Sequence, residues 1–132
     1  MSDARVDNES RWNQPADARA VRRLRHCVAA FAGSAGMKGA GLSDLELAVT
    51  EALTNVVVHA YVGVESGAVD VLAVQVDGHL EVTVCDRGIG MRPRSDSPGL
   101  GLGLSLIASL ARDTRITDTP GGGTTVRMQF AR

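Results

Sequence analysis

Three polar side chains recur at every fourth position between Thr50 and Tyr61: Glu51, Asn55 and His59. In an α-helix this spacing places them on one side, away from the apolar stripe of the same segment. The amide oxygen of Asn55 is a hard, neutral ligand that suits Mg2+, which takes few protein ligands and keeps several waters. A carboxylate one turn away can accept a proton from an attacking hydroxyl or water. Taken alone, the stripe also fits the exposed polar face of an amphipathic helix, and a histidine in such a place is more often structural than a ligand.

Three glycine-rich clusters follow this segment, and each has a chemistry that suits a bound nucleotide. The first, DRGIGM at residues 86–91, follows a predicted strand, where a carboxylate can accept a hydrogen bond from an exocyclic amine such as that of adenine. Gly88 and Gly90 allow a tight turn and a close approach to a flat ligand. The second, GLGLGL at 99–104, leads into a predicted helix, whose first N–H groups form a cradle for phosphate. The third, GGGT at 121–124, enters a predicted strand and ends in a hydroxyl.

Each cluster alone also fits an ordinary turn, and two familiar phosphate motifs do not match. The P-loop requires Gly-Lys-Ser/Thr, a triplet that the chain does not contain. The dinucleotide fingerprint requires a third glycine, but Pro93 holds that position after the first cluster and Leu104 holds it after the second. The polar stripe and the three clusters, taken in this order and spacing, are harder to explain as turns.

Hydrophobic periodicity predicts three helices. The first begins at Pro15, where the missing N–H of proline is tolerated, and ends within Gly33–Gly41. The second begins at Ser43, which forms a capping box with Glu46, and runs to Tyr61. The third spans residues 100–111. The apolar stripes of the first two helices contain Val21, Leu24, Val28 and Phe31, and Leu45, Val49, Leu53, Val56 and Ala60.

The strands predict how the helices are arranged. Residues 69–76 and 80–85 are rich in β-branched residues and flank Asp77-Gly78, which indicates a hairpin with a tight turn. Further strands are predicted at 115–119 and 124–130. Helices alternating with mostly hairpin-linked strands indicate an α/β fold: a two-layer sandwich of a mixed, mostly antiparallel sheet with helices on one face.

The chain fits a single domain preceded by a tail. Residues 1–14 are polar and are expected to form a flexible N-terminal tail, with a short edge strand near Ser10–Asn13. Residues 15–132 then form one domain of ordinary size.

Composition excludes several classes of function. A net charge of -1 and an aromatic content of 3% argue against broad nucleic-acid binding. The polar N-terminus does not fit a signal peptide, and no apolar run approaches the roughly 20 residues of a membrane span. The two cysteines, Cys27 and Cys85, are expected to be buried thiols in a reducing compartment. The sequence therefore predicts a cytoplasmic protein.

The order Glu-x-x-x-Asn, Asp-x-Gly-x-Gly, Gly-x-Gly-x-Gly and Gly-Thr resembles the GHKL ATPase superfamily, whose domains have the Bergerat-type ATP-binding fold. The resemblance covers residues from about 16 to 130. Within the superfamily the chain is similar to the bacterial anti-sigma-factor serine/threonine kinases. This narrower resemblance rests on its small size, the string TEALTNVVVHAY at 50–61, and a short loop between the second and third motifs.

The resemblance implies a site for ATP and Mg2+. It assigns Asn55 as the Mg2+ ligand, Glu51 as the general base and Asp86 as the acceptor for the adenine amine. The remaining implied nucleotide-binding residues are Gly88, Gly90, Met91 and Thr124 around the base, and Gly99, Gly101 and Gly103 in the lid and phosphate loop.

The implied function is an ATP-binding anti-sigma factor and serine kinase. Such a protein binds a sigma factor, phosphorylates a STAS-type anti-anti-sigma partner and commonly forms a homodimer. The alternatives are a nucleotide-binding anti-sigma module without kinase activity and a switch kinase of stress signalling. A detached histidine kinase domain is disfavoured, because the chain has no room for a phospho-acceptor hairpin. The basic side of the first helix, Arg19, Arg22, Arg23 and Arg25, fits either a solvated face or a partner contact.

Overall fold

The computed structural model describes residues 6–90 and 98–131, and for residues 98–103 it describes the backbone alone. The elements follow one another as β1 (Val6–Pro15), α1 (Ala18–Ser34), α2 (Gly39–Asn55), a π-helical turn η1 (Val56–Ala60), β2 (Ala68–Val76), β3 (His79–Asp86), α3 (Pro98–Leu110), β4 (Asp113–Asp118) and β5 (Thr124–Ala131).

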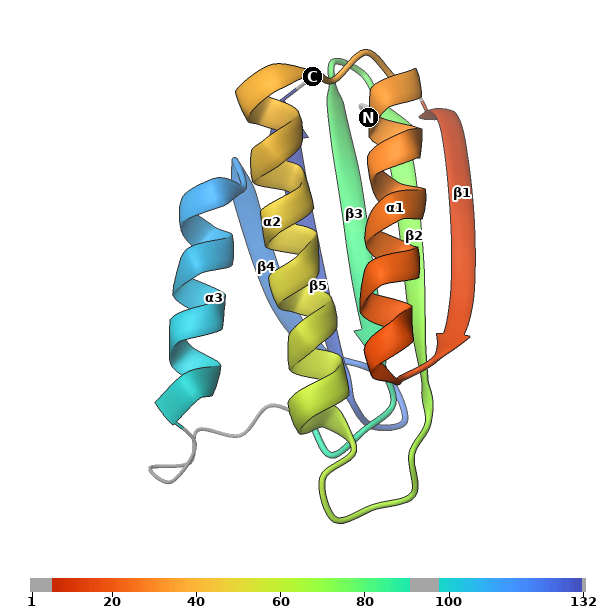
Figure 1. The fold of residues 1–132 in the computed structure, drawn as a ribbon, viewed down its shortest axis with the longest axis vertical. Helices are drawn as coiled ribbons and strands as arrows, with labels where there is room; N and C mark the ends of the chain where they lie inside the picture. Colours follow the sequence, from red (N-terminus) through yellow and green to blue (C-terminus); the bar gives the residue numbers. More distant parts are fainter. Residues whose placement is uncertain (1–5, 91–97, 132) are drawn as a thin grey trace.

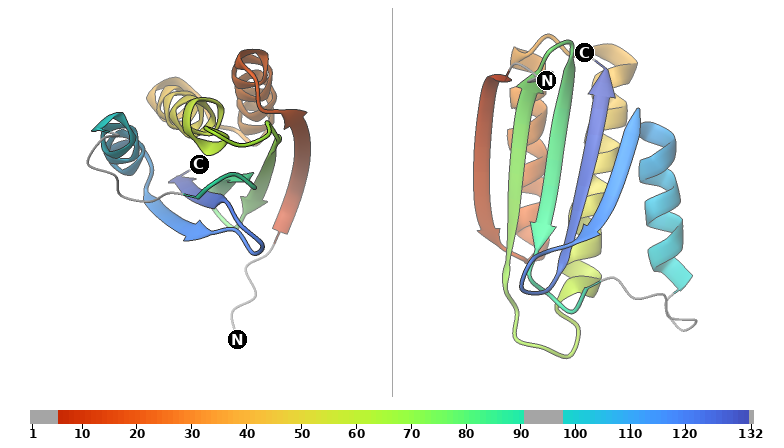
Figure 2. Two further views of the ribbon diagram at one scale, coloured as in Figure 1. Left: turned by 90° about the horizontal axis from the view of Figure 1, so that it is seen from below. Right: turned by 180° about the vertical axis from the view of Figure 1, so that it is seen from behind.

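One sheet and one layer of helices make up the molecule. The strand order is β1-β2-β3-β5-β4, and all three helices lie against the same face of the sheet (Figures 1 and 2). The predicted two-layer α/β sandwich is therefore confirmed. The four strand pairings described are all antiparallel, where the sequence had suggested a mixed sheet.

The core lies between the sheet and the middle helix, α2. Alternate residues of the central strands point toward the helices and are buried, as in β2 with Val69, Val71 and Ala73. The apolar stripe predicted for α2 is buried throughout, including Leu45 and Leu53. The opposite face of the sheet is not covered by any described helix (Figure 2).

The β2–β3 hairpin forms as the sequence predicts. Asp77 and Gly78 make the turn, and Gly78 has a φ of 74°, a conformation that favours glycine. The predicted strands 115–119 and 124–130 correspond to β4 and β5 with shifts of at most two residues. Cys27 and Cys85 are free thiols, as expected, but both are half-buried.

The start of α2 differs from the sequence-based expectation. The helix begins at Gly39, after Lys38, so Ser43 lies inside the helix and the predicted capping box is wrong. The extra turn brings Leu42 against the core beside the buried Met37. Most helix stability in proteins comes from such packing, and here it outweighs the local capping preference of Ser43.

Strand β1 also differs, because it is much longer than the short edge strand expected near Ser10–Asn13. Residues 6–14, which were expected to belong to a flexible tail, pair with β2 along nearly their whole length. The indole ring of Trp12 packs edge-on against Phe31 of α1, with ring centroids 6.4 Å apart. One aromatic contact and a continuous ladder of backbone hydrogen bonds thus order a segment whose other residues are mostly polar.

No helix in the described part of the chain is both long and apolar enough to cross a bilayer.

The packing of β1 predicts the effect of Trp12→Ala. Loss of the indole from the α1–β1 contact should lower the free energy of unfolding by about 2–4 kcal/mol, since large-to-small aromatic changes typically have this size. Urea denaturation followed by circular dichroism measures this effect, because the variant lacks the only tryptophan of the chain. Val6→Ala, at an exposed position of the same strand, is the control and should change stability by less than about 0.5 kcal/mol. A Trp12→Ala variant as stable as this control would show that β1 does not depend on the contact.

Candidate functional site

The polar stripe predicted on α2 continues into a π-helical turn. Glu51 and Asn55 belong to α2, whereas His59 lies in η1. A π-helical turn widens the spiral to i→i+5 hydrogen bonding, and such turns often occur at functional sites. At the last residue of this turn, the carbonyl of Ala60 accepts a hydrogen bond from the Ile89 N–H at 2.8 Å. This bond joins the end of the helical segment to the loop that follows β3.

Asp86 occupies the buried end of β3. Its side chain is 6% exposed, and Oδ1 accepts hydrogen bonds from the N–H of Gly88 at 2.9 Å and from the N–H of Thr124 at 3.3 Å. Burial raises the pKa of the Asp86 carboxyl above its ordinary value, while the two backbone hydrogen bonds lower it in part. Both hydrogen bonds described for the carboxylate go to Oδ1, so Oδ2 keeps its capacity to accept.

Two glycines bring the loops close enough to make these bonds. A Cβ atom at Gly88 would overlap the carbonyl oxygen of Ala60. A Cβ atom at Gly123 would overlap the carbonyl oxygen of Asp86, and Gly123 also has a φ of 106°. Only glycine permits these approaches without a shift of the backbone.

The end of α2, the turn η1 and the end of β3 enclose a cavity of about 30 Å3. Its polar lining comes from Asn55, His59, Asp86 and Thr124, with Gly90 beside them, and its remaining walls are apolar. The side-chain nitrogen of Asn55 is buried and has no hydrogen-bond partner among the residues that the structure describes. An orphaned buried amide of this kind needs a partner, and its position in the wall points to a ligand in the cavity.

The structure therefore brings together four of the predicted site residues, Asn55, Asp86, Gly90 and Thr124, and ties Gly88 to them through the Asp86 carboxylate. Glu51 is half-buried on α2, but it is not among the residues that line the cavity.

The other predicted residues stand apart from this group. The run of glycines at 99, 101 and 103 does not precede α3 but lies in its first two turns. Met91 and the two arginines predicted in the lid, Arg92 and Arg94, lie outside the described residues.

Sequence reasoning missed two contributors, Tyr61 and Thr119. It named His59 as part of the polar stripe but gave it less weight, and His59 lines the cavity. Tyr61 and Thr119 both bond to the backbone beside Asp86. Their contacts span 26 and 33 residues of sequence, and no local pattern signals them.

A preformed metal centre is not part of this arrangement. Among the described residues no group of three or more His, Cys, Asp and Glu side chains could hold a metal ion. A Mg2+ site would not require such a group, because Mg2+ needs only one or two protein ligands and completes its shell with water and phosphate oxygens. Asn55 is the residue in the cavity wall that suits this role.

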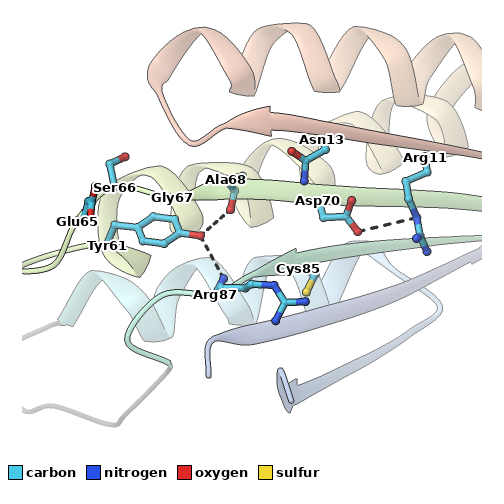
Figure 3. A pocket seen from close by; sticks show the side chains of 10 residues that line it. All are labelled: Arg11, Asn13, Tyr61, Glu65, Ser66, Gly67, Ala68, Asp70, Cys85 and Arg87. Atoms are coloured by element: carbon cyan, nitrogen blue, oxygen red, sulfur yellow. Dashed lines mark hydrogen bonds and ion pairs between the residues drawn. The ribbon is translucent and has the colours of Figure 1, made fainter. Parts of the chain in front are cut away.

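A second, larger cavity of about 530 Å3 lies on the uncovered face of the sheet (Figure 3). Side chains of β1, β2, β3 and the 61–68 loop line it, among them Arg11, Asp70 and Arg87. Arg11 is 4.0 Å from Asp70, and both side chains are exposed. Size alone favours this cavity as a ligand site, but the orphaned amide and the buried carboxylate belong to the smaller one.

Comparison with known proteins agrees with the motif pattern. Residues 14–130 match the family model of the histidine kinase-like ATPase domain. An anti-sigma F factor from Pasteuria penetrans is 32% identical over 116 residues, which cover 79% of this chain and 77% of the relative. The serine-protein kinase RsbW of Bacillus thuringiensis (strain Al Hakam) is 30% identical over 122 residues, which cover 81% of this chain and 76% of the relative.

A solved structure supports the fold. The crystal structure of the RsbU and RsbW domains of a Mycobacterium tuberculosis protein matches 95% of this chain with a TM-score of 0.75 at 24% sequence identity. The matched region is 33% of that larger protein. The resemblance inferred from the motifs is confirmed: the chain belongs to the histidine kinase-like (GHKL) ATPase family, and its relatives include anti-sigma F factors and RsbW serine-protein kinases.

Proposed function

We propose that the chain binds Mg-ATP in the cavity between the end of α2 and the end of β3. The observation that carries this proposal is the buried amide nitrogen of Asn55. It has no partner in the described part of the chain, and it lies in the wall of the same cavity as the Asp86 carboxylate. The neutral amide suits the phosphates of a nucleotide and their metal ion. The buried carboxylate, a hydrogen-bond acceptor, suits its base. Membership of an ATPase family supports the same ligand.

The base end of the site consists of Asp86, Gly90 and Thr124. Oδ2 of Asp86 accepts a hydrogen bond from the exocyclic amine of adenine, while Oδ1 keeps its hydrogen bonds from the backbone N–H groups of Gly88 and Thr124. The apolar walls around it, among them Val84 and Val126, suit the faces of a purine ring. The cavity of about 30 Å3 is far smaller than the roughly 300–1,000 Å3 of small-molecule sites, so its walls must separate when a nucleotide enters.

The phosphate end consists of Asn55 and the N-terminal turns of α3. Asn55 is the proposed ligand of Mg2+, and the backbone at Gly99, Gly101 and Gly103 is the proposed phosphate cradle. When bound, Mg2+ neutralises phosphate oxygens and so favours phosphoryl transfer. Met91 is assigned to the rim of the base pocket by family resemblance alone.

The reaction we propose is transfer of the terminal phosphoryl group to a serine of a STAS-type anti-anti-sigma protein, with a sigma factor as the second partner. Glu51, one helical turn before Asn55, orients and deprotonates the serine hydroxyl. Relatives named anti-sigma F factor and serine-protein kinase RsbW support this role. We further propose a cytoplasmic homodimer.

A nucleotide-binding anti-sigma module without chemistry is the second candidate. It is favoured by the position of Glu51, which does not line the described cavity. In that case the nucleotide sets the conformation of the protein, and the sigma factor is bound stoichiometrically without phosphorylation of any partner.

Substitution of Asp86 by Asn separates binding from folding. The amide oxygen of Asn can still accept from Gly88 and Thr124, so the free energy of unfolding should not fall. Affinity for ATP should drop by roughly 10- to 100-fold, because a charge-assisted hydrogen bond contributes about 1.5–3 kcal/mol. Calorimetric titration and thermal denaturation measure the two effects. An Asp86→Asn variant that binds ATP as tightly as wild type would rule out the assigned role.

The pH dependence follows from the raised pKa of Asp86. A carboxyl whose pKa is higher in the folded than in the unfolded protein destabilises the fold when it is ionised. Wild type should therefore gain stability relative to Asp86→Asn as the pH falls through the raised pKa, and lose ATP affinity over the same interval. Parallel titrations of both proteins against pH check this, and a pH-independent difference in stability would contradict it.

Substitution of Asn55 by Ala tests the metal assignment. Removal of the amide should abolish most of the increase in ATP affinity that Mg2+ produces, while binding measured in EDTA should change little. Asn13→Ala, on the uncovered face of the sheet, is the matched control and should retain the full Mg2+ effect. An Asn55→Ala protein with an unchanged Mg2+ effect would exclude Asn55 as the ligand.

Substitution of Glu51 by Gln tests the reaction. The variant should bind Mg-ATP with wild-type affinity, because Glu51 does not line the base pocket, and should lose at least about 100-fold in phosphorylation of a STAS-type partner. Glu46→Gln, on the same helix, should phosphorylate normally. A wild-type protein that binds ATP and the partner but never transfers phosphate would favour the module without chemistry.

A further inference from the structure

The peptide group between Asp86 and Arg87 is held at both ends by side chains from distant segments. Its carbonyl oxygen accepts a hydrogen bond from Thr119 Oγ1 at 2.9 Å. Its N–H donates to the phenol oxygen of Tyr61 at 3.1 Å. Tyr61 follows η1, and Thr119 lies in the connection between β4 and β5. The two side chains together fix the orientation of one peptide plane.

The Thr119 contact is buried and is part of a larger network. Thr119 is 5% exposed, and its backbone N–H and C=O bond to Gly123 and Gly122 across the β4–β5 turn. Because a carbonyl oxygen only accepts, Thr119 donates its single hydroxyl proton to Asp86. Thr125 Oγ1 lies 3.0 Å away, and its single proton serves either Thr119 Oγ1 or Cys85 Sγ, which is 3.5 Å from it. The hydroxyl is therefore held between the end of β3 and the start of β5.

The Tyr61 contact is more exposed than that of Thr119, but a second hydrogen bond and a glycine constrain it. The phenol donates its proton to the carbonyl oxygen of Ala68 at 2.6 Å, so it accepts from Arg87 (Figure 3). The ring lies directly over Gly67, where a Cβ atom would come within 2.6 Å of it. Glycine at position 67 and the carbonyl of Ala68 thus hold the phenol oxygen where the Arg87 N–H meets it.

Rotation of this peptide group would move two features of the base end of the site: the Asp86 carboxylate and the turn at residues 88–89. The backbone on its N-terminal side carries the Asp86 carboxylate. On its C-terminal side follow the Gly88 N–H, which bonds to that carboxylate, and the Ile89 N–H, which bonds to Ala60. A fixed peptide plane therefore fixes both the direction of the carboxylate and the turn that completes its hydrogen bonding.

We propose that Tyr61 and Thr119 are positioning residues of the nucleotide site, which present the Asp86 carboxylate to the exocyclic amine of adenine. The proposal rests on the proposed function as an ATP-binding protein. Neither side chain lines the small cavity, so each acts through the backbone of residues 86–87 and not by contact with the nucleotide. Tyr61 instead lines the cavity on the uncovered face, so the contacts that orient the Asp86–Arg87 peptide group extend to the opposite side of the sheet.

The consequence is specific to the base. Inosine triphosphate carries a carbonyl in place of the exocyclic amine, so wild-type protein should bind it more weakly than ATP. A misdirected Asp86 carboxylate weakens the binding of ATP. It changes the affinity for inosine triphosphate little, because that ligand has no exocyclic amine for the carboxylate to bind. The ratio of the two dissociation constants therefore reports carboxylate placement, and partial unfolding cancels from that ratio because it weakens both ligands equally.

The test compares Thr119→Val, Thr119→Ser and Tyr61→Phe with wild type by calorimetric titration of ATP and inosine triphosphate. Valine preserves the shape of threonine but has no hydroxyl, serine restores the hydroxyl, and phenylalanine removes only the phenol oxygen. Thr119→Val and Tyr61→Phe should each lower the preference for ATP by about threefold to tenfold, the range of one lost hydrogen bond. Thr119→Ser should regain most of the preference. Thr83→Val, on β3 and facing away from the helices, should leave it unchanged.

The outcomes separate the two proposals. Wild-type protein that is folded and nucleotide-free yet binds no ATP would overturn both the proposed function and the inference built on it. Wild-type binding with an unchanged preference in Thr119→Val and Tyr61→Phe would overturn the inference alone. Loss of thermal stability with an unchanged preference would likewise assign these side chains a purely structural role.

Discussion

The carboxylate of Asp86 is buried at the end of β3, where an ionised group is unfavourable unless it is hydrogen-bonded. One of its oxygens meets this requirement with the backbone N–H groups of Gly88 and Thr124. Both donors come from segments that must approach very closely, which explains why glycine stands at positions 88 and 123. The pKa of the carboxyl is nevertheless raised, so its burial is not fully compensated within the protein. A perturbed group of this kind beside a cavity is a typical component of a binding site.

The arrangement around Asp86 depends on both layers of the fold. The helical layer supplies Asn55 at the end of α2 and His59 in the π-helical turn, and the sheet supplies Asp86 and Thr124 from neighbouring strands. The bond from Ile89 to the Ala60 carbonyl joins the two layers at the rim of the small cavity. On the other side of the sheet, the Tyr61 hydroxyl joins the first residue of β2, Ala68, to Arg87, which follows the end of β3. The candidate site thus lies where elements from both halves of the chain meet.

The sequence predicts most of this fold because the relevant signals are local. The β2–β3 hairpin follows from Asp77-Gly78 and its flanking alternation, and Asn55, Asp86 and Thr124 could be singled out by residue type and spacing. Predictions failed where packing between distant segments decides the outcome. Helix α2 begins before Ser43 because Leu42 packs against the core, which a capping rule does not consider.

Contacts between distant segments also explain the features that the sequence predicted only in part or not at all. The strand at residues 6–15 depends on one tryptophan that packs against α1. The exposure of its side chains alternates along the second half of the strand, but the sequence does not show this because polar residues stand on both faces. The roles of Tyr61 and Thr119 depend on backbone groups 26 and 33 residues away. The π-helical turn that places His59 at the cavity has no signature among three consecutive valines and could not be distinguished from a continuation of α2.

The most direct test of this account is a crystal structure of the full chain with Mg2+ and a non-hydrolysable ATP analogue. The account predicts the adenine amine within hydrogen-bonding distance of Asp86 Oδ2, Asn55 next to the metal, and the walls of the small cavity moved apart. A nucleotide found instead in the larger cavity beside Arg11 and Arg87, with the small cavity unchanged, would contradict it.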